Sequence, residues 1–135
     1  MAENTKTFVI DASYVLSFLL PSENTPEAQK LFSLYQQQKI SLIAPILLSY
    51  EIANALKTNV MRKKISQKQA YNLLSAFKLL NIKQAPIGFK DVLKTAIDHN
   101  VSAYDASYLV LAKKKGAKLL TLDKKLSRIY NLIER

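Results

Sequence analysis

Short apolar runs alternate along the chain with longer segments whose apolar positions recur at helical spacing. Most of these runs carry apolar residues on both faces, which is typical of strands buried inside a sheet. Such strands are expected at residues 7–10, 41–44, 82–85 and 118–121.

The segments between these runs predict helices, because their apolar residues recur every three to four positions. Pro45 suits a first helical turn, and Gly116 suits the position just after a helix. The helices are expected at residues 14–20, 27–38, 46–62, 66 to about 81, 89–99 and 103–115, with a short helix after residue 123. Strands alternating with helices predict an α/β fold of three layers, in which helices cover both faces of a parallel sheet.

Composition favours one unit with a buried core. The chain has 135 residues, 49% hydrophobic and 22% charged, without repeats, low-complexity tracts or linkers, so residues 1–135 are expected to form one domain. The absence of cysteine excludes disulfides, thiolate zinc sites and cysteine nucleophiles, and favours a reducing cytoplasm. The polar N-terminus and the lack of a long apolar stretch predict neither a signal peptide nor a membrane span.

Glycine and charge content narrow the function classes. With two glycines, Gly88 and Gly116, no window holds a glycine-rich phosphate-binding loop, which excludes the usual ATPase, GTPase and nucleotide-cofactor sites. Twenty Lys and Arg residues against ten Asp and Glu give a net charge of +10. This charge favours a polyanionic partner, whether nucleic acid, an acidic membrane or an acidic protein.

Four acidic residues stand in apolar surroundings, unlike the others. Asp11 and Asp123 follow the first and last predicted strands, Asp105 lies in the first turn of a helix, and Glu51 lies in the second turn of the helix predicted over 46–62. Ligands of parallel sheets gather at the carboxyl ends of the strands. All four side chains are therefore expected to point into one crevice.

Such a cluster of carboxylates predicts a metal site. Two carboxylates about 4 Å apart repel by roughly 4 kcal/mol at an effective dielectric near 20, so the cluster must take up protons or bind a cation. Hard oxygen ligands without His or Cys favour Mg²⁺ or Mn²⁺. Outside the four acids, 20 basic residues face 6 acidic ones. An acidic metal-holding centre with a basic rim is what cleavage of a phosphodiester backbone requires.

Each acid also has a purely structural interpretation. Asp11 and Asp123 suit the starts of the helices that follow them, and Ser102 with Asp105 matches a capping box. Glu51 is harder to explain in this way, because the helix dipole favours an acid little beyond the first turn. The metal hypothesis therefore depends on the joint pattern of the four acids.

Around these acids the sequence resembles the PIN domain and, within it, the VapC-type ribonuclease toxins of toxin–antitoxin pairs. The matching segments are residues 8–13 (FVIDAS), 50–56 (YEIANAL), 104–112 (YDASYLVLA) and 119–123 (LLTLD). Their order and spacing cover nearly the whole chain. The resemblance implies a PIN-like α/β/α fold around a mostly parallel sheet of four to five strands.

The resemblance also implies a Mg²⁺- or Mn²⁺-dependent endoribonuclease with one or two ions, acting as a homodimer and restrained by an antitoxin protein whose tail covers the site. Asp11, Glu51 and Asp105 match the acidic triad of the family, and Asp123 matches its fourth, more variable acid. An ion held by the triad would activate water for in-line attack on phosphorus, leaving a 5′-phosphate and a 3′-hydroxyl.

Three polar residues resemble supporting positions of the family. Thr121 matches a hydroxyl position that supports the metal site, Ser13 lies where the family often has a hydroxyl, and Asn54 is a common companion of Glu51. Capping or local hydrogen bonding explains Ser13 and Asn54 equally well.

Two basic groups are candidate RNA contacts, because one ends the helix that carries Glu51 and the other adjoins Asp123. They are Arg62, Lys63 and Lys64, and Lys124 and Lys125. Both groups also fit ordinary solvated faces.

Two other functions remain open. A non-catalytic RNA-binding module with the same fold predicts RNA retention that persists in EDTA and survives Asp105→Ala. A phospho-acceptor signalling domain requires adjacent acids after the first strand and a lone acceptor Asp at a central strand end, where this chain has the helix-borne Glu51 instead.

Overall fold

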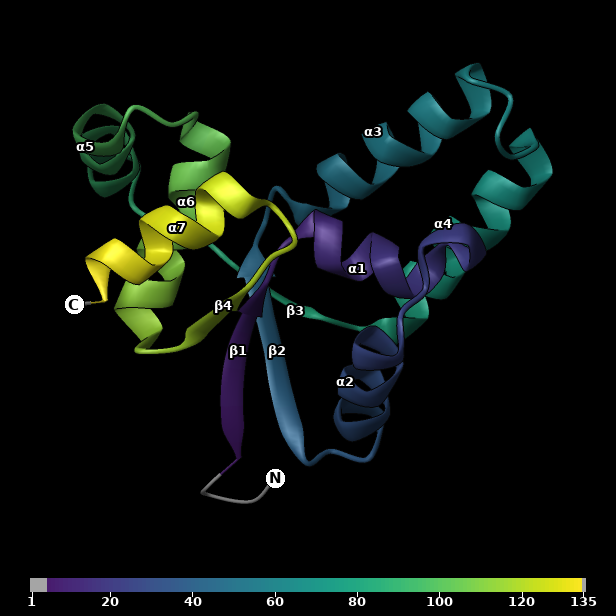
Figure 1. Cartoon of the computed structure of the whole chain (residues 1–135), viewed down its shortest axis with the longest axis horizontal. Helices are drawn as coiled ribbons and strands as arrows, with labels where there is room; N and C mark the ends of the chain where they lie inside the picture. The colour runs from purple at the N-terminus through teal and green to yellow at the C-terminus, as the bar shows by residue number, and fades with distance from the viewer. Residues whose placement is uncertain (1–4, 135) are drawn as a thin grey trace.

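A parallel sheet lies at the centre of the computed structural model, which describes residues 5–134. Its strands are β1 (Lys6–Ile10), β2 (Ile40–Pro45), β3 (Lys83–Ala85) and β4 (Lys118–Leu120). They lie in the order β3-β2-β1-β4, and all pairings are parallel. Val9 of β1 stands beside Ile43 of β2 and Leu119 of β4. The carboxyl ends of the strands therefore share one edge of the sheet (Figure 1).

Helices cover both faces of this sheet and give the three layers that the sequence predicts. They are α1 (Ala12–Leu19), α2 (Pro26–Gln36), α3 (Leu48–Met61), α4 (Gln67–Leu80), α5 (Phe89–His99), α6 (Ala103–Lys115) and α7 (Lys124–Ile133), with a 3₁₀ turn, η1 (Pro21–Glu23), after α1. Figure 1 shows α1 to α4 on one side of the sheet and α5 to α7 on the other. The predicted α/β class and the parallel sheet are confirmed.

Burial on both faces explains why the carboxyl-terminal halves of β1 and β2 are apolar. Val9 and Ile10 are neighbours on β1, so their side chains point to opposite faces, and both are completely buried. Phe32 of α2, Ile52 of α3 and Leu111 of α6 are also completely buried and belong to the same core. Each such side chain contributes roughly 1.5–3 kcal/mol through burial. This core holds the site-bearing ends of the strands and helices in place.

Residues in the left-handed conformation end three of the helices. Gly116, with a φ of 58°, follows α6 as the sequence predicts, because glycine adopts this conformation without steric conflict. Asn81 and Asn100 occupy the same position after α4 and α5, with φ values of 53° and 52°. Asparagine tolerates this conformation better than most other residues.

The start of α3 differs from the prediction. Pro45 is the last residue of β2, where it pairs with Ala85 of β3, and α3 begins at Leu48 rather than Ile46. A proline is tolerated at the end of a strand because little hydrogen bonding is lost there. As a result, Glu51 lies in the first turn of α3, not in the second.

Two predictions concern the ends of the chain and the absence of a membrane-spanning segment. Residues 1–4 and 135, which include most of the polar N-terminal segment and both ends of the predicted domain 1–135, lie outside the described residues. Within residues 5–134, no helix is both long and apolar enough to cross a membrane.

Candidate active site at the carboxyl edge of the sheet

Asp11 lies at the centre of the candidate site, directly after β1. Its backbone N–H donates to the carbonyl of Leu120 (3.2 Å), which continues the ladder between β1 and β4. The side chain caps α1 by accepting from the Tyr14 N–H (3.1 Å). The predicted capping role is therefore present. Asp11 is buried, at 7% exposure, beside the ends of two strands.

Two hydroxyl groups join Asp11 to the loop after β4. Ser13 donates to Asp11 Oδ1 (2.6 Å) and accepts from the Leu122 N–H (3.0 Å). Thr121 donates to Asp11 Oδ2 and accepts from the Asp123 N–H (3.0 Å). Both hydroxyls thus hold the first acid and also fix the loop that carries the fourth, and the structure places Ser13 and Thr121 beside Asp11.

Burial changes the ionisation of Asp11. Loss of solvent raises the pKa of its carboxyl above the ordinary value, and the charge of Asp123 acts in the same direction. The hydrogen bonds from Ser13, Thr121 and Tyr14 oppose this rise in pKa, because they favour the charged form. The three donors fix the position of the carboxylate, but their hydrogen bonds do not fully offset the cost of burying its charge.

Glu51 enters the site from the first turn of α3, where the helix dipole favours a negative charge. It is half-buried, and its Oε1 accepts a 2.5 Å hydrogen bond from the hydroxyl of Tyr108 on α6. Burial raises the pKa of Glu51, and the charges of Asp11 and Asp105 raise it further, while the Tyr108 hydrogen bond lowers it. Glu51 therefore lies within electrostatic reach of two other acids of the site.

Asp105 lies in the first turn of α6, and its backbone N–H donates to the Ser102 hydroxyl that caps this helix (3.0 Å). No described residue donates a hydrogen bond to its carboxylate. Partial burial raises the pKa of Asp105, and the charges of Asp123 and Asp11 raise it further, while Lys125 lowers it. The Ser102 cap is present as predicted, but the carboxylate itself takes no part in it.

Asp123 is the most open of the four acids. It is exposed and caps α7 by accepting from the Leu126 N–H (3.0 Å). A shallow hollow of about 440 Å³ lies beside it, lined by Thr121, Lys124 and Arg128 among others. Asp123 therefore connects the buried acids to a basic surface on α7.

The donor set suits a hard divalent cation, because it consists of carboxylate oxygens whose mutual repulsion a cation would relieve. The four acids meet at one edge of the sheet and influence one another electrostatically. Within residues 5–134, however, no three Asp, Glu or His side chains are grouped closely enough to hold one ion. Three of these carboxylates can bind the same ion only after their side chains rotate toward one another.

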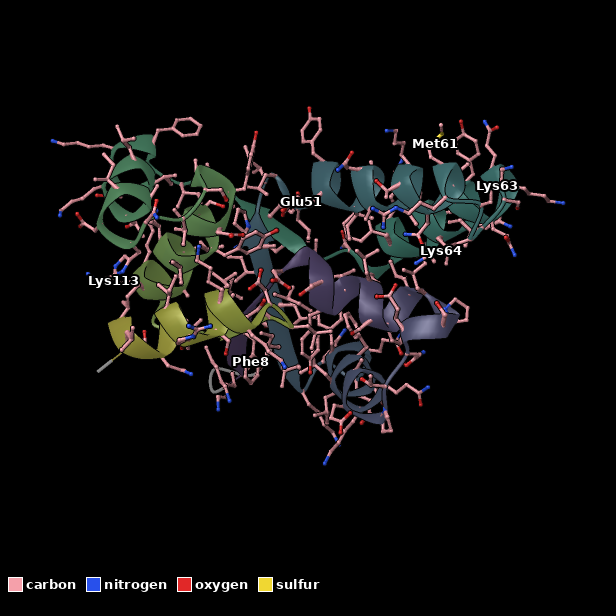
Figure 2. All side chains as sticks on the ribbon, turned by 45° about the horizontal axis from the view of Figure 1, so that its top comes forward. Phe8, Glu51, Met61, Lys63, Lys64 and Lys113 are labelled. Carbon is pink, nitrogen blue, oxygen red and sulfur yellow. The ribbon has the colours of Figure 1, made fainter. Side chains whose placement is uncertain are left out.

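The other predicted site residues are dispersed. Lys125 acts electrostatically on Asp105 and so lies close to the acids. Arg62, Lys63 and Lys64 follow the far end of α3, about 16 Å from Glu51 at the rise of a helix, and Figure 2 shows Glu51 and Lys63 at opposite ends of it. Asn54 is exposed on α3.

The contact between Tyr108 and Glu51 was not predicted from the sequence. Tyr108 is 1% exposed and belongs to the core, but its hydroxyl reaches an acid 57 residues away in the chain. Burial raises the pKa of the Tyr108 phenol far above its ordinary value, so it stays a protonated donor. The spacing of three residues between Asp105 and Tyr108 was the available signal, since it places both on one side of a helix.

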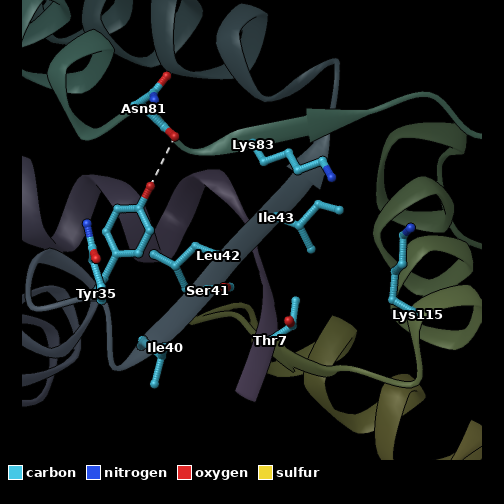
Figure 3. Close-up of a pocket in the computed structure, with 10 residues that line it drawn as sticks. Thr7, Tyr35, Ile40, Ser41, Leu42, Ile43, Asn81, Lys83 and Lys115 are labelled. Carbon is cyan, nitrogen blue, oxygen red and sulfur yellow. Dashed lines mark hydrogen bonds between the residues drawn. The ribbon is translucent and has the colours of Figure 1, made fainter. Parts of the chain in front are cut away.

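A second hollow, of about 510 Å³, lies on the sheet toward the amino ends of the strands (Figure 3). Thr7, Ile40 and Lys83, each at or near the start of a strand, line it together with Tyr35 and Lys115. None of the described residues that line it is acidic. This hollow is therefore separate from the four acids of the candidate site, which lie at the carboxyl edge of the sheet.

Comparison with known proteins identifies a family and relatives that match most of the chain. The PIN domain family model matches residues 8–132. The chain is 35% identical over 126 residues to "Ribonuclease VapC3" of Pyrobaculum aerophilum, covering 90% of this chain and 93% of the relative. It is 31% identical over 119 residues to "VapC ribonuclease Mb0985" of Mycobacterium bovis, covering 88% of this chain and 87% of the relative.

A solved structure shares the fold. The crystal structure of PAE2754 from Pyrobaculum aerophilum superposes with a TM-score of 0.72 at 23% sequence identity, covering 93% of this chain and 85% of that chain. At this identity the likeness concerns the fold alone. It agrees with the three-layer arrangement described above.

Proposed function

Because the chain belongs to the PIN domain family and groups there with the VapC proteins, we propose that it is a metal-dependent endoribonuclease and the toxin of a toxin–antitoxin pair. One observation carries the proposal. Asp11, Glu51 and Asp105 come from three separate elements, and the pKa of each is raised by burial and by the neighbouring acids. Acids arranged in this way favour binding of a cation.

Asp11, Glu51 and Asp105 would hold the first Mg²⁺ or Mn²⁺, and Asp123 is the ligand available to a second. A bound divalent cation supplies a polarised scissile phosphate and a nucleophile derived from water. Two hydrogen-bonded hydroxyls, those of Ser13 and Thr121, keep the first carboxylate in one orientation. Such orientation of a ligand supports affinity for the ion.

RNA is the proposed substrate because the surface around the acids is basic. The net charge of +10 attracts the phosphate backbone. Lys125 lies beside Asp105, and Lys124 and Arg128 line the hollow next to Asp123, so one face of α7 offers phosphate contacts close to the acids. Arg62, Lys63 and Lys64 would meet RNA only at a distance from the scissile bond.

Cleavage of structured RNA by the purified protein tests this function. We expect cleavage in Mg²⁺ that EDTA stops and that Asp11→Ala or Asp105→Ala abolishes. Asp91→Asn is the matched control, since Asp91 is an exposed acid on α5. Cleavage that persists in EDTA, or that Asp105→Ala leaves intact, contradicts the proposal.

We also propose that the protein acts as a homodimer through α5. Phe89, Leu93 and Ile97 recur every four residues on this helix and are 83%, 61% and 69% exposed. A stripe of large exposed apolar side chains usually marks a contact surface. Around a two-fold axis, antiparallel α5 helices would place Leu93 against its copy and Phe89 against Ile97.

An antitoxin that binds and inhibits the protein in the cytoplasm completes the proposal. The names of the VapC relatives and the positive charge, which favours an acidic partner, support it. Co-expression with the product of an adjacent gene should yield a complex without ribonuclease activity, whereas expression of the toxin alone should arrest growth. Growth that is indifferent to the toxin contradicts this role.

A non-catalytic RNA-binding module is the second candidate. It is favoured by the finding that no three acidic side chains of residues 5–134 are grouped for one ion. It predicts that RNA is retained equally in Mg²⁺ and in EDTA, and that Asp105→Ala binds RNA like the wild type without any cleavage by either protein.

A further inference from the structure

Tyr108 occupies a position where a phenylalanine would satisfy the packing. Its side chain is 1% exposed, within the core between α6 and the sheet. A hydroxyl at such a depth is unfavourable unless it finds a partner. The partner is Oε1 of Glu51, at 2.5 Å, and no described residue donates to the second oxygen of that carboxylate.

The hydroxyl groups of two partly buried tyrosines make a different kind of contact. The Tyr35 hydroxyl donates to the backbone carbonyls of Leu80 (2.7 Å) and Asn81 (3.0 Å), and Figure 3 shows the second bond. The Tyr130 hydroxyl points to the carbonyl of Ala117 (3.5 Å). These contacts join elements of the fold, whereas the Tyr108 hydroxyl contacts an acid of the candidate site.

Tyr108 is also placed to act together with Asp105. The two residues lie one turn apart on α6, so this helix carries one acid of the site and the group that holds another. Glu51 comes from α3, on the other side of the sheet in Figure 1. The hydrogen bond therefore fixes a side chain of α3 relative to the acid on α6.

We propose that Tyr108 is a positioning residue for the cation: its hydroxyl holds Oε1 of Glu51 so that the remaining oxygen stays available as a ligand beside Asp105. This inference rests on the proposed function. Groups that orient metal ligands typically contribute a factor of about 10–100 in metal affinity or activity. Loss of the hydroxyl should therefore weaken cation binding without affecting the binding of RNA.

Tyr108→Phe tests this role, because it removes the hydroxyl and keeps the ring. We expect Mn²⁺ affinity, measured by calorimetry on the protein without RNA, to fall at least tenfold. The Mg²⁺ concentration for half-maximal cleavage should rise by a similar factor, with an unchanged KM for RNA. Tyr104→Phe, on the same helix but 65% exposed, should change neither quantity.

Tyr35→Phe is the control for a purely structural effect, since it also removes a hydroxyl bonded across the fold. It should lower the melting temperature and leave the Mn²⁺ affinity unchanged. If Tyr108→Phe lowers the melting temperature but not the Mn²⁺ affinity, Tyr108 is structural and the inference is wrong. If the wild type neither binds Mn²⁺ nor cleaves RNA, the proposed function fails first and the inference fails with it.

A measurement on the wild type covers the case in which Tyr108→Phe does not fold. The carbon-13 resonance of the carbon that bears the Tyr108 hydroxyl should shift when Mg²⁺ is added, because the carboxylate that accepts its hydrogen bond then binds the ion through its other oxygen. The corresponding resonance of Tyr35 should not move. Equal responses of the two tyrosines, or none at Tyr108, overturn the inference.

Discussion

Replacement of Asp105 by asparagine is predicted to stabilise the protein in the absence of divalent cations while abolishing cleavage. Asparagine has nearly the shape of aspartate, and the Asp105 carboxylate accepts no hydrogen bond from the described residues, so the exchange removes a charge and little else. Asp11 is less suitable for this test, because its carboxylate accepts three hydrogen bonds that an amide cannot all replace.

The magnitude follows from the charges around Asp105. Asp123, Asp11 and Glu51 repel it and Lys125 attracts it, so at least one pair of like charges is left uncompensated. Such a pair is worth about 1 kcal/mol at 4 Å in a water-like dielectric. Because the site is open to solvent and screened by salt, we expect a gain of about 0.5–1 kcal/mol in the free energy of unfolding. For a chain of this length the melting temperature should rise by roughly 2–4 °C.

The pH dependence of stability has a defined sign. The folded-state pKa values of Asp11, Glu51 and Asp105 are raised, mainly by burial, so the folded protein binds more protons than the unfolded chain. The metal-free protein should therefore lose stability as pH rises from the ordinary carboxyl range through the raised folded-state values. Asp105→Asn should make this loss smaller.

Thermal unfolding in EDTA at pH 5 and pH 7 measures both effects. Asp98→Asn is the control, because Asp98 is ion-paired with Lys94 on α5 (2.7 Å) and its pKa is lowered by that hydrogen bond. Its replacement should not raise the melting temperature. An Asp105→Asn variant that is less stable than the wild type in EDTA at pH 7 refutes the view that these acids repel one another.

Three further predictions concern the surroundings of the acids. Thr121→Val should lower the free energy of unfolding, measured with urea, by about 1–3 kcal/mol, and should lower the rate of RNA cleavage about tenfold or more. Thr121→Ser keeps the hydroxyl and should retain both the stability and the cleavage rate. Lys125→Glu should raise the KM for RNA in steady-state cleavage and make this KM less dependent on salt concentration. Lys113→Glu, at the far end of α6, should have a smaller effect on the KM. Leu93→Glu should yield monomers by light scattering, whereas Leu79→Glu, at an isolated exposed position on α4, should leave a dimer.

Local patterns were sufficient to predict the elements and the edge at which the acids meet. The short apolar runs become strands covered on both faces, as the burial of Val9 and Ile10 illustrates. Asp11 follows β1, and Asp123 lies in the loop after β4. These two strands pair in parallel, so the sheet topology alone brings both acids to one edge. The Ser102 cap and the Gly116 end of α6 depend on near neighbours and were predicted for the same reason.

Features that depend on packing between distant segments were not predictable. The start of α3 moved by two residues because Pro45 joined β2, which changed the turn that holds Glu51. The hydrogen bond from Tyr108 to Glu51 depends on how α3 and α6 meet, which no local pattern determines. Sequence spacing also could not tell how closely the acids approach, and residues 5–134 contain no preassembled group of three.

We expect one divalent cation to be shared by the carboxylates of Asp11, directly after β1, of Glu51 on α3 and of Asp105 on α6. Anomalous diffraction from crystals soaked in Mn²⁺ tests it most directly, because it locates the ion independently of activity. We expect a peak bounded by the carboxylates of Asp11, Glu51 and Asp105, and no peak there in crystals of Asp105→Asn. Mn²⁺ bound only elsewhere, or the absence of any peak between these three side chains at millimolar Mn²⁺, would contradict it.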